Sequence, residues 1–357
     1  SNLGLFDVLG IGAAFDAIAG APLHRVAWCF GDSTIDAPLP PFADGDHPWG
    51  RVLGREHLDT LLRDRASELG ATIMQPCTVR KIERIADGHC CIVSDPEGTS
   101  HTLESSIVID AHGSWQRDPF DDSEAARPRK VRGSDLFAFK ANFSGAQLAQ
   151  GVLPVLAFDG GYGGMVQGDH GLLTLACCIR HDRLQQRRED AVGAAAGDVV
   201  QALLESEVRA VRQALVGAIR EGAWLAVGPV RPRIAIANHG AGRFAVGNAA
   251  GEAHPILGEG ISMAVQSAFM LCARLIEGNH DVDSYRKAWR RAFAPRIRFA
   301  ELYAHIAMRP TLTRIALPAL KRWPKLLSLG ARLGGKARCA VDPERILRSR
   351  QSAAPQH

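Results

Sequence analysis

A chain of 357 residues is longer than one typical domain, so we expect two lobes or one lobe with a large insertion. Its hydrophobic content of 46% and charged content of 22% are ordinary for a globular protein that buries a core without metals or disulfides. The net charge of +4 is too small to indicate a nucleic-acid partner, and no aromatic stacking platform accompanies the basic runs.

The eight cysteines show no paired C-x-x-C spacing suited to zinc, so we predict no metal site. Cys90-Cys91 and Cys177-Cys178 lie within apolar runs and are expected to be buried free thiols in a reducing compartment. No signal peptide opens the sequence, and no apolar run reaches the roughly 20 residues that span a bilayer. We therefore expect a cytoplasmic protein.

The first third of the chain alternates helical and extended patterns. A helical stretch over 5–19 is followed by a strand at Arg25–Phe30 and by a Pro- and Gly-rich loop at Asp36–Gly50. Apolar residues on one face predict a helix from Arg55 to Leu69, which Gly70 would cap. Strand-like runs follow at Thr72–Gln75, Val79–Ile85, Cys90–Ser94 and Ile107–Asp110.

The middle of the chain reads as an antiparallel sheet and the end as helices. Between about Ser134 and Arg180, the predicted strands are Leu136–Asn142, Val155–Phe158, Met165–Gln167 and Leu172–Ile179. Helical pattern at Ala191–Arg220 precedes strands at Trp224–Val227 and Phe244–Gly247. The remaining predicted helices are Gly260–Ile276, Ser284–Met308 and a Pro-broken, basic and apolar region to about Leu333.

The stretch from Phe244 to Ala268 carries the strongest functional signal. It reads as a buried strand, a turn of small residues, a Pro- and Gly-rich loop and a helix. Small residues allow a ligand to approach the backbone closely. Gly258 and Gly260 are predicted to place bare N–H groups at the helix start, where the macrodipole favours negative charge.

This stretch resembles the second flavin-binding motif of the aromatic-ring hydroxylase superfamily, a Gly-Asp pair followed by a Pro-x-x-Gly-x-Gly turn and a helix. Asn248 stands where the family usually has an Asp that binds the ribityl chain of FAD. The alternative interpretation is a strand–loop–helix corner that needs glycine only for sharp turns. The resemblance implies FAD contacts at Gly247, Asn248, Ala249, Pro255, Gly258, Gly260 and Ile261.

Three weaker resemblances follow in the family's order. The run beginning Arg55-Glu-His-Leu-Asp looks like a family helix whose Arg faces the cofactor, and Val79 matches a strand whose backbone touches adenine. Ile107–Trp115 looks like the Ala-Asp-Gly motif, with His112 replacing Asp. Each also has an ordinary interpretation: a surface Arg, a strand interior and a turn residue.

The run Gly160-Gly-Tyr-Gly-Gly-Met165 resembles a strand of the geranylgeranyl-reductase branch that faces the flavin. The resemblance makes Tyr162 the candidate for lining a substrate cavity. A hairpin kinked by glycines is the alternative.

The family's opening G-x-G-x-x-G unit is not found. Gly10-Ile-Gly12-Ala-Ala-Phe15 imitates it, but Phe15 replaces the third Gly and the preceding apolar run is too short, so we predict a helix–turn there. We expect the missing β–α–β unit to precede this sequence in the full protein. Without it, FAD affinity is expected to be poor, because that unit cradles the pyrophosphate.

Together these observations predict an α/β protein with an interrupted Rossmann-like FAD-binding lobe, an inserted antiparallel substrate sheet and C-terminal helices. The FAD lobe would comprise residues 1–133 and 231–280, the substrate-binding sheet and helices 134–230, and the helical segment 281–357.

By resemblance, the expected function is that of an FAD-dependent oxidoreductase acting on an apolar or aromatic small molecule, as a monooxygenase or a double-bond reductase, with FAD reduced by NADH or NADPH. His254 and Glu259 flank the turn near the flavin and are the candidate proton donors. The basic, apolar Ile315–Leu333 segment could lie on a membrane surface or pack on the body. The competing hypothesis is a binding or scaffold protein that kept the fold without catalysis.

Overall fold

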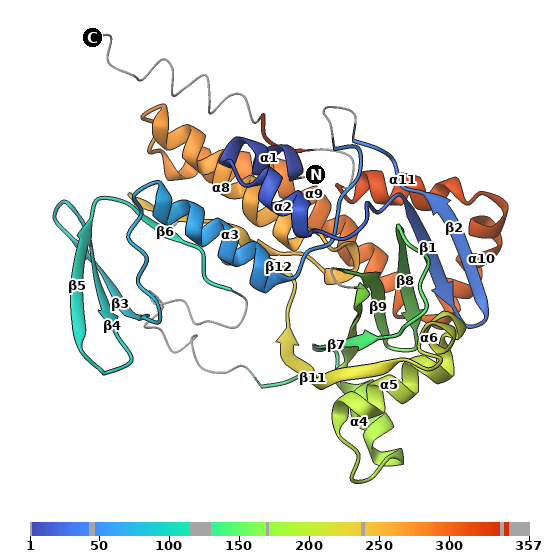
Figure 1. Ribbon diagram of the computed structural model, residues 1–357. Helices are drawn as coiled ribbons and strands as arrows, with labels where there is room; N and C mark the ends of the chain where they lie inside the picture. The colour runs from blue at the N-terminus through green and yellow to red at the C-terminus, as the bar shows by residue number, and fades with distance from the viewer. Residues whose placement is uncertain are drawn as a thin grey trace.

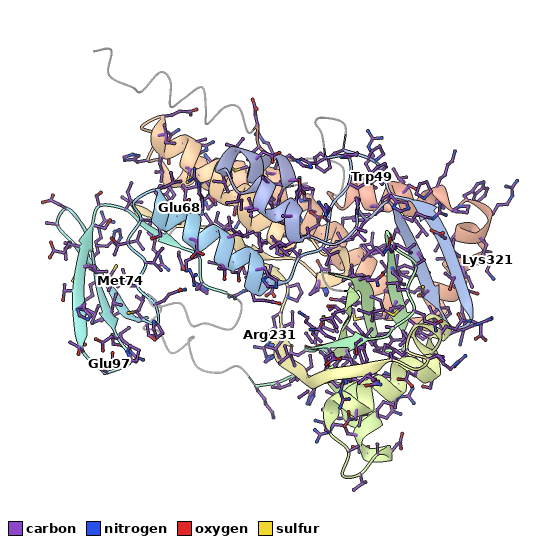
Figure 2. All side chains as sticks on the ribbon, viewed as in Figure 1. Trp49, Glu68, Met74, Glu97, Arg231 and Lys321 are labelled. Carbon is purple, nitrogen blue, oxygen red and sulfur yellow. The ribbon has the colours of Figure 1, made fainter. Side chains whose placement is uncertain are left out.

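The computed structural model describes residues 2–42, 47–113, 130–168, 171–236, 240–335 and 339–342. Figure 1 shows a large sheet with helices on both sides, a layer of long helices beside it, and a small separate sheet at the far end. Figure 2 places Met74 and Glu97 at the end with the small sheet and Lys321 at the opposite end of the molecule.

The large sheet has seven strands in the order β11–β7–β10–β9–β8–β1–β2. Neighbouring strands run antiparallel except β1 and β8, which are parallel, with Arg25 opposite Val152. The strands are β1 (Arg25–Phe30), β2 (Ser33–Pro38), β7 (Leu136–Ser144), β8 (Val152–Phe158), β9 (Gly161–Gln167), β10 (Leu173–Arg180) and β11 (Ile219–Val230). The antiparallel sheet predicted for the middle of the chain is therefore present.

Strands β1 and β2 extend this sheet with residues from the N-terminal part of the chain. The division into three domains stays a prediction, but residues 25–38 pair with the sheet predicted for 134–230. The loop predicted from Asp36 begins too early, because β2 continues to Pro38. In β2, Ile35 and Ala37 point inward between exposed neighbours, a short alternation that the flanking Pro and Asp residues obscured.

One face of the sheet is covered by α4 (His181–Asp190), α5 (Ala196–Glu207) and α6 (Arg209–Ala214). Val200, Leu204 and Val211 of these helices pack in one cluster with Phe143 and Leu175 of the sheet. The helical pattern predicted for 191–220 is confirmed over α5 and α6, but its predicted bounds extend too far at both ends. Extended backbone at Val208 separates α5 from α6, and β11 already begins at Ile219.

The other face of the sheet packs against α9 (Val282–Ala307), α10 (Pro310–Arg322) and α11 (Lys325–Leu333). Trp28 of β1, Ala304 of α9 and Leu327 of α11 belong to the same buried cluster. The Pro-broken helical region predicted to run to about Leu333 is thus confirmed as two helices.

A second packing unit surrounds α8 (Gly260–Ile276), where Phe244, Met263, Trp289 and Phe293 form an apolar cluster. β6 (Val108–Asp110) pairs in parallel with β13 (Arg243–Ala245) beneath it. The predicted helices at Arg55 and Gly260 are both confirmed. The remaining elements here are α1 (Leu3–Leu9), α2 (Gly12–Ile18), α3 (Arg55–Glu68), β12 (Arg233–Ile234), α7 (Gly247–Ala250), β14 (Gly251–Glu252) and the 3₁₀ turn η3 (Pro255–Leu257).

The Gly10-x-Gly12 run is a helix–turn–helix, as predicted, and does not form a nucleotide cradle. Gly10 ends α1 in the left-handed conformation, with φ of 80°, and Gly12 opens α2. Phe6 and Phe15 from the two helices pack together with Leu58 of α3.

The small sheet contains β3 (Thr78–Ile85), β4 (Gly88–Ser94) and β5 (Ser100–Ser105) in that order. Its first two strands were predicted. The strand predicted at Thr72–Gln75 is not formed, and β5 was missed because its six residues are all exposed and carry no apolar alternation.

The contact between α5 and β11 gives a test of the packing beneath the large sheet. An added Cβ at Gly197 of α5 would lie 2.3 Å from Cβ of Trp224, so Gly197→Ala should lower the free energy of unfolding by about 1–3 kcal/mol. Gly4→Ala in α1 is the matched control, because an added Cβ there meets nothing within 4 Å and alanine favours the helix. Urea denaturation of both variants measures the difference. Equal stability of the two variants would contradict the packing described here.

Candidate functional site

The strand–turn–helix stretch is built around two glycines in the left-handed conformation. Gly247 follows β13 with φ of 57°, and Gly258 follows η3 with φ of 62°. A Cβ added at Gly247 would lie 3.3 Å from Cβ of Ala264 in α8. Glycine at these positions therefore lets the chain leave the strand, pass under α8 and turn back into the helix without strain.

Two amides of this stretch, including one that was expected to be bare, are bonded within the protein. The N–H of Gly247 donates to Oγ of Ser267 at 2.9 Å, and the N–H of Gly258 donates to the Pro255 carbonyl at 2.8 Å. The prediction of a bare N–H at Gly258 is therefore wrong, because the tight turn itself uses that group. Gly260 opens α8 at the surface, and a Cβ added there would meet open space. The first amides of α8 are those that a helix leaves without an intrahelical partner.

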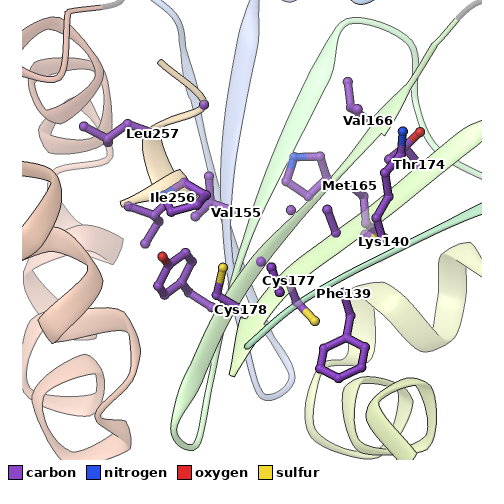
Figure 3. A pocket seen from close by; sticks show the side chains of 18 of the residues that line it. Phe139, Lys140, Val155, Met165, Val166, Thr174, Cys177, Cys178, Ile256 and Leu257 are labelled. Atoms are coloured by element: carbon purple, nitrogen blue, oxygen red, sulfur yellow. The ribbon is translucent and has the colours of Figure 1, made fainter. Parts of the chain in front are cut away.

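A cavity of about 550 Å³ lies between the large sheet and this turn. Figure 3 shows Ile256 and Leu257 on one side of it, with Lys140 and Thr174 on the other. Most of the wall is aliphatic, aromatic or sulfur-containing. The lining residues come from five strands and the turn: Ala138, Phe139, Lys140, Leu153, Pro154, Val155, Tyr162, Gly163, Gly164, Met165, Val166, Thr174, Ala176, Cys177, Cys178, Leu225, Ala226, Val227, Pro255, Ile256, Leu257 and Gly258.

Tyr162 connects the sheet to the residue that precedes the turn. Its hydroxyl lies 3.1 Å from Nδ1 of His254, and the two rings meet edge to face. Tyr162 is 1% exposed, and burial raises the pKa of its phenol well above the usual value. Burial also lowers the pKa of His254 to about 4. At neutral pH the pair is therefore an uncharged phenol and an uncharged imidazole.

Of the other predicted residues, some line the cavity and others lie around the start of α8. Pro255 and Gly258 line the cavity, as Tyr162 does. Glu259 is 4% exposed and forms the N-terminal cap position of α8, outside the cavity wall formed by described residues. Ala249 is buried, and Asn248, Gly260 and Ile261 are exposed around the start of α8.

Arg55 and Val79 lie outside the cavity. The Arg55 guanidinium donates to the Asp59 carboxylate at 2.8 Å on the exposed side of α3. Val79 is in β3 of the small sheet and is 44% exposed. Their contacts with a cofactor stay predictions.

His112 takes part in a partly buried polar cluster that the sequence did not indicate. Its Nδ1 lies 2.6 Å from the Asp110 carboxylate, and the 5%-exposed guanidinium of Arg243 lies 3.5 Å from the same group. Burial acts to raise the pKa of Asp110, but the hydrogen bonds from His112 outweigh it, so the pKa is lowered. The Asp110 carbonyl also accepts the Val246 N–H, which places the cluster directly beside the strand before Gly247.

A buried polar network holds the first two turns of α8. Gln266 is fully buried; its Nε2 donates to Oδ1 of Asn2 at 3.1 Å, and its Oε1 accepts from Arg296 and from the Ala340 N–H. Ser262 and Gln266 are polar residues within an amphipathic helix, where polar residues are usually exposed. The sequence therefore did not predict that they are buried. The network joins the N-terminus, α8, α9 and residues 339–342.

Among the described residues, no three His, Cys, Asp or Glu side chains are grouped to hold a metal ion. All eight cysteines are free thiols. Cys177 and Cys178 are buried, as predicted, whereas Cys90 and Cys91 are only partly so.

No family profile and no curated protein sequence matches the chain. Solved structures do. The myxobacterial chondrochloren halogenase CndH, an FAD-dependent halogenase, is 14% identical with a TM-score of 0.70, covering 98% of this chain and 85% of that one. HpxO of Klebsiella pneumoniae, solved with FAD and uric acid, is 16% identical with a TM-score of 0.63, covering 97% and 85%.

A geranylgeranyl bacteriochlorophyll reductase-like protein of Thermoplasma acidophilum is 13% identical with a TM-score of 0.60, covering 98% of this chain and 85% of that one. The expected mixed α/β architecture is confirmed by these likenesses. The chain thus has the fold of the flavin-dependent halogenase CndH, of HpxO and of the geranylgeranyl reductase-like protein.

Proposed function

We propose that the protein is an FAD-dependent oxidoreductase that acts on an apolar or aromatic small molecule, with FAD reduced by NADH or NADPH. One observation carries the proposal. The Pro255–Gly258 turn, which resembles a flavin-binding motif, forms part of the wall of an apolar cavity of about 550 Å³. A cavity of this size and lining is typical of small-molecule sites.

The residues around the turn fit a flavin. The open space at Gly260 leaves room beside the first amides of α8, and the positive end of that helix would stabilise the negative charge of a reduced isoalloxazine. Gly258, Gly260 and Ile261 would hold the ring, with Asn248 near the ribityl chain. Bound FAD supplies the redox chemistry, and the chain's own residues hold it, orient it and exclude water.

The cavity also indicates the class of substrate. Its wall is mostly aliphatic and aromatic, so binding would be driven by burial of apolar surface. Lys140 and Thr174 are the polar groups on the side away from the turn, and Thr174 Oγ1 already donates to Asn142 at 2.8 Å. We infer that Lys140 orients a polar end of an otherwise apolar substrate. The reaction is proposed as oxygen-dependent modification or double-bond reduction.

The roles proposed for the two proton-donor candidates differ. His254 is uncharged at neutral pH, so it would act through its hydrogen bond to Tyr162 and not as an imidazolium acid. Tyr162 lines the cavity and is the group of the pair that can reach a substrate. Glu259 would position the first turn of α8 and would not donate a proton, since it occupies the N-cap position of that helix.

A charge placed at the start of α8 tests the flavin site. Gly260→Asp should weaken FAD binding by tenfold or more, about 1.4 kcal/mol, and shift the flavin reduction potential to more negative values, because the carboxylate repels the reduced ring. An acid in the first turn stabilises a helix, so loss of folding would not explain the result. Flavin absorbance titration of the full-length protein measures the affinity.

Gly260→Asn is the matched control, because it has the same size without the charge and should stay within about threefold of the original affinity. If both variants bind FAD equally well, the helix start does not face the ring. A full-length protein that takes up no FAD at all would favour the non-catalytic scaffold.

The Tyr162–His254 pair gives a pH prediction. The folded protein keeps His254 uncharged until about pH 4, whereas the unfolded chain takes up the proton near pH 6.5. Stability contributed by the uncharged ring is complete above pH 6.5 and should be lost by roughly 1.4 kcal/mol per pH unit as the pH falls towards 4. Urea unfolding at several pH values should show a shallower loss in His254→Gln. The variant of exposed His280, His280→Gln, should keep the original slope; equal slopes in all three proteins would refute the assignment.

A further inference from the structure

The two last helices present a surface that is both apolar and basic. The exposed apolar side chains include Ile315 at 76% and Trp323 at 58% exposure. We define the α10–α11 surface by its apolar residues Ile315, Trp323, Leu326, Leu329 and Leu333 and its basic residues Arg314, Lys321, Arg322, Lys325 and Arg332. Figure 2 shows Lys321 at the outer edge of the molecule.

Helix α11 is firmly packed by its opposite side. Leu327 is 3% exposed in the cluster beneath β1 and β2, and the Ser328 hydroxyl donates to the Pro38 carbonyl at 2.6 Å. Leu326, Leu329 and Leu333 are spaced by three and four residues, so they share the outward face. Their exposure therefore follows from the way the helix docks on the sheet.

The charge of this surface has one sign. From Pro310 to Leu333 the chain carries five Arg or Lys residues and no Asp or Glu. None of the five forms an ion pair with an acidic side chain in the described part of the chain. The Arg322 guanidinium lies 5.9 Å from the centre of the Trp323 ring, where it leaves both groups at the surface.

We propose that the α10–α11 surface docks on a lipid bilayer that contains anionic headgroups. Leucines flanked by cations, with a tryptophan at the helix junction, are the combination that lies in the interfacial layer of a membrane. A second copy of the chain would bring the same positive charge against this surface, so self-association is disfavoured. None of the described helices is long and apolar enough to cross a bilayer, so the contact is peripheral.

The docked surface ends beside the cavity. A Cβ added at Gly334, which follows α11, would lie 3.0 Å from Cδ1 of Leu257, and Leu257 lines the cavity. If the proposed function holds, an apolar substrate dissolved in the bilayer would meet the protein next to its binding site. Docking itself requires neither FAD nor substrate, so its test is independent of the proposed function.

Vesicle sedimentation of the full-length protein tests the proposal. Binding should be strong to phosphatidylcholine vesicles that contain phosphatidylglycerol, weak to phosphatidylcholine alone, and reduced by added salt. Tryptophan fluorescence should shift to the blue on binding, and Trp323→Phe should remove most of that shift. Absence of binding to the anionic vesicles, or equal binding to both kinds, would overturn the proposal.

The double variant Leu326→Ser/Leu329→Ser should weaken binding to anionic vesicles at least tenfold, because two side chains leave the apolar layer. Lys321→Glu/Arg322→Glu should weaken it similarly and remove the salt dependence. Leu69→Ser at the end of α3 is the matched control, since Leu69 is 58% exposed but lies outside the α10–α11 surface, and it should bind like the original protein. Unchanged binding by the double variant would overturn the assignment to this surface. So would a dimer in sedimentation velocity that the double variant dissociates.

Discussion

The hydrogen bond between Tyr162 and His254 joins the large sheet to the turn that precedes α8. Both side chains are largely buried, so breaking the bond would leave two desolvated polar groups without their partner. The bond fixes the distance between β9 and the Pro255–Gly258 turn, and Ile256 then packs into the sheet cluster. The cavity exists because these two parts of the chain are held together at one edge and stay apart at the other.

The sheet divides the molecule into two environments. On one face, α4–α6 close a continuous apolar core around Leu175 and Val200. On the other face, α9–α11 contact β1, β2, β8 and β9, and the cavity lies between the sheet and the turn. The buried network around Gln266 adds a third element, since it holds the start of α8 in place from behind. The sheet, the turn and the network around Gln266 therefore together hold the residues of the candidate site.

Much of the local structure could be predicted from the sequence, and the reasons differ between elements. Helices α3 and α8 show a clear apolar face, and the strands from Leu136 to Arg180 alternate between Gly-rich turns. β5 and β2 lack a long apolar pattern, and the helix break at Val208 carries no Pro or Gly to signal it. Pairing between distant segments, such as β1 with β8, leaves no local trace at all.

The site was predictable to the extent that it depends on backbone conformation. Gly247 and Gly258 adopt positive φ, which a cluster of small residues in a turn does indicate. Tertiary contacts, such as the hydrogen bond from Gly247 to Ser267, decide which N–H groups remain available to a ligand. The spacing of residues in the sequence does not predict these contacts. The same holds for Asp110 and His112, whose partner Arg243 comes from a distant strand. Tyr162 was found because its glycine-rich strand resembles a strand in a known family.

The parallel pairing of β1 with β8 has a consequence for how the chain reaches this state. Arg25 must pair with Val152, although α3, the small sheet and β7 are all made in between. During synthesis, β1 and β2 would leave the ribosome long before β8. Until β8 is made, they can pair only with each other. Such distant pairing makes folding slow, since closing the long loop costs entropy before the contacts between β1 and β8 form. Until then, Trp28 of the β1–β2 hairpin is exposed, and we expect a chaperone to bind this segment during synthesis.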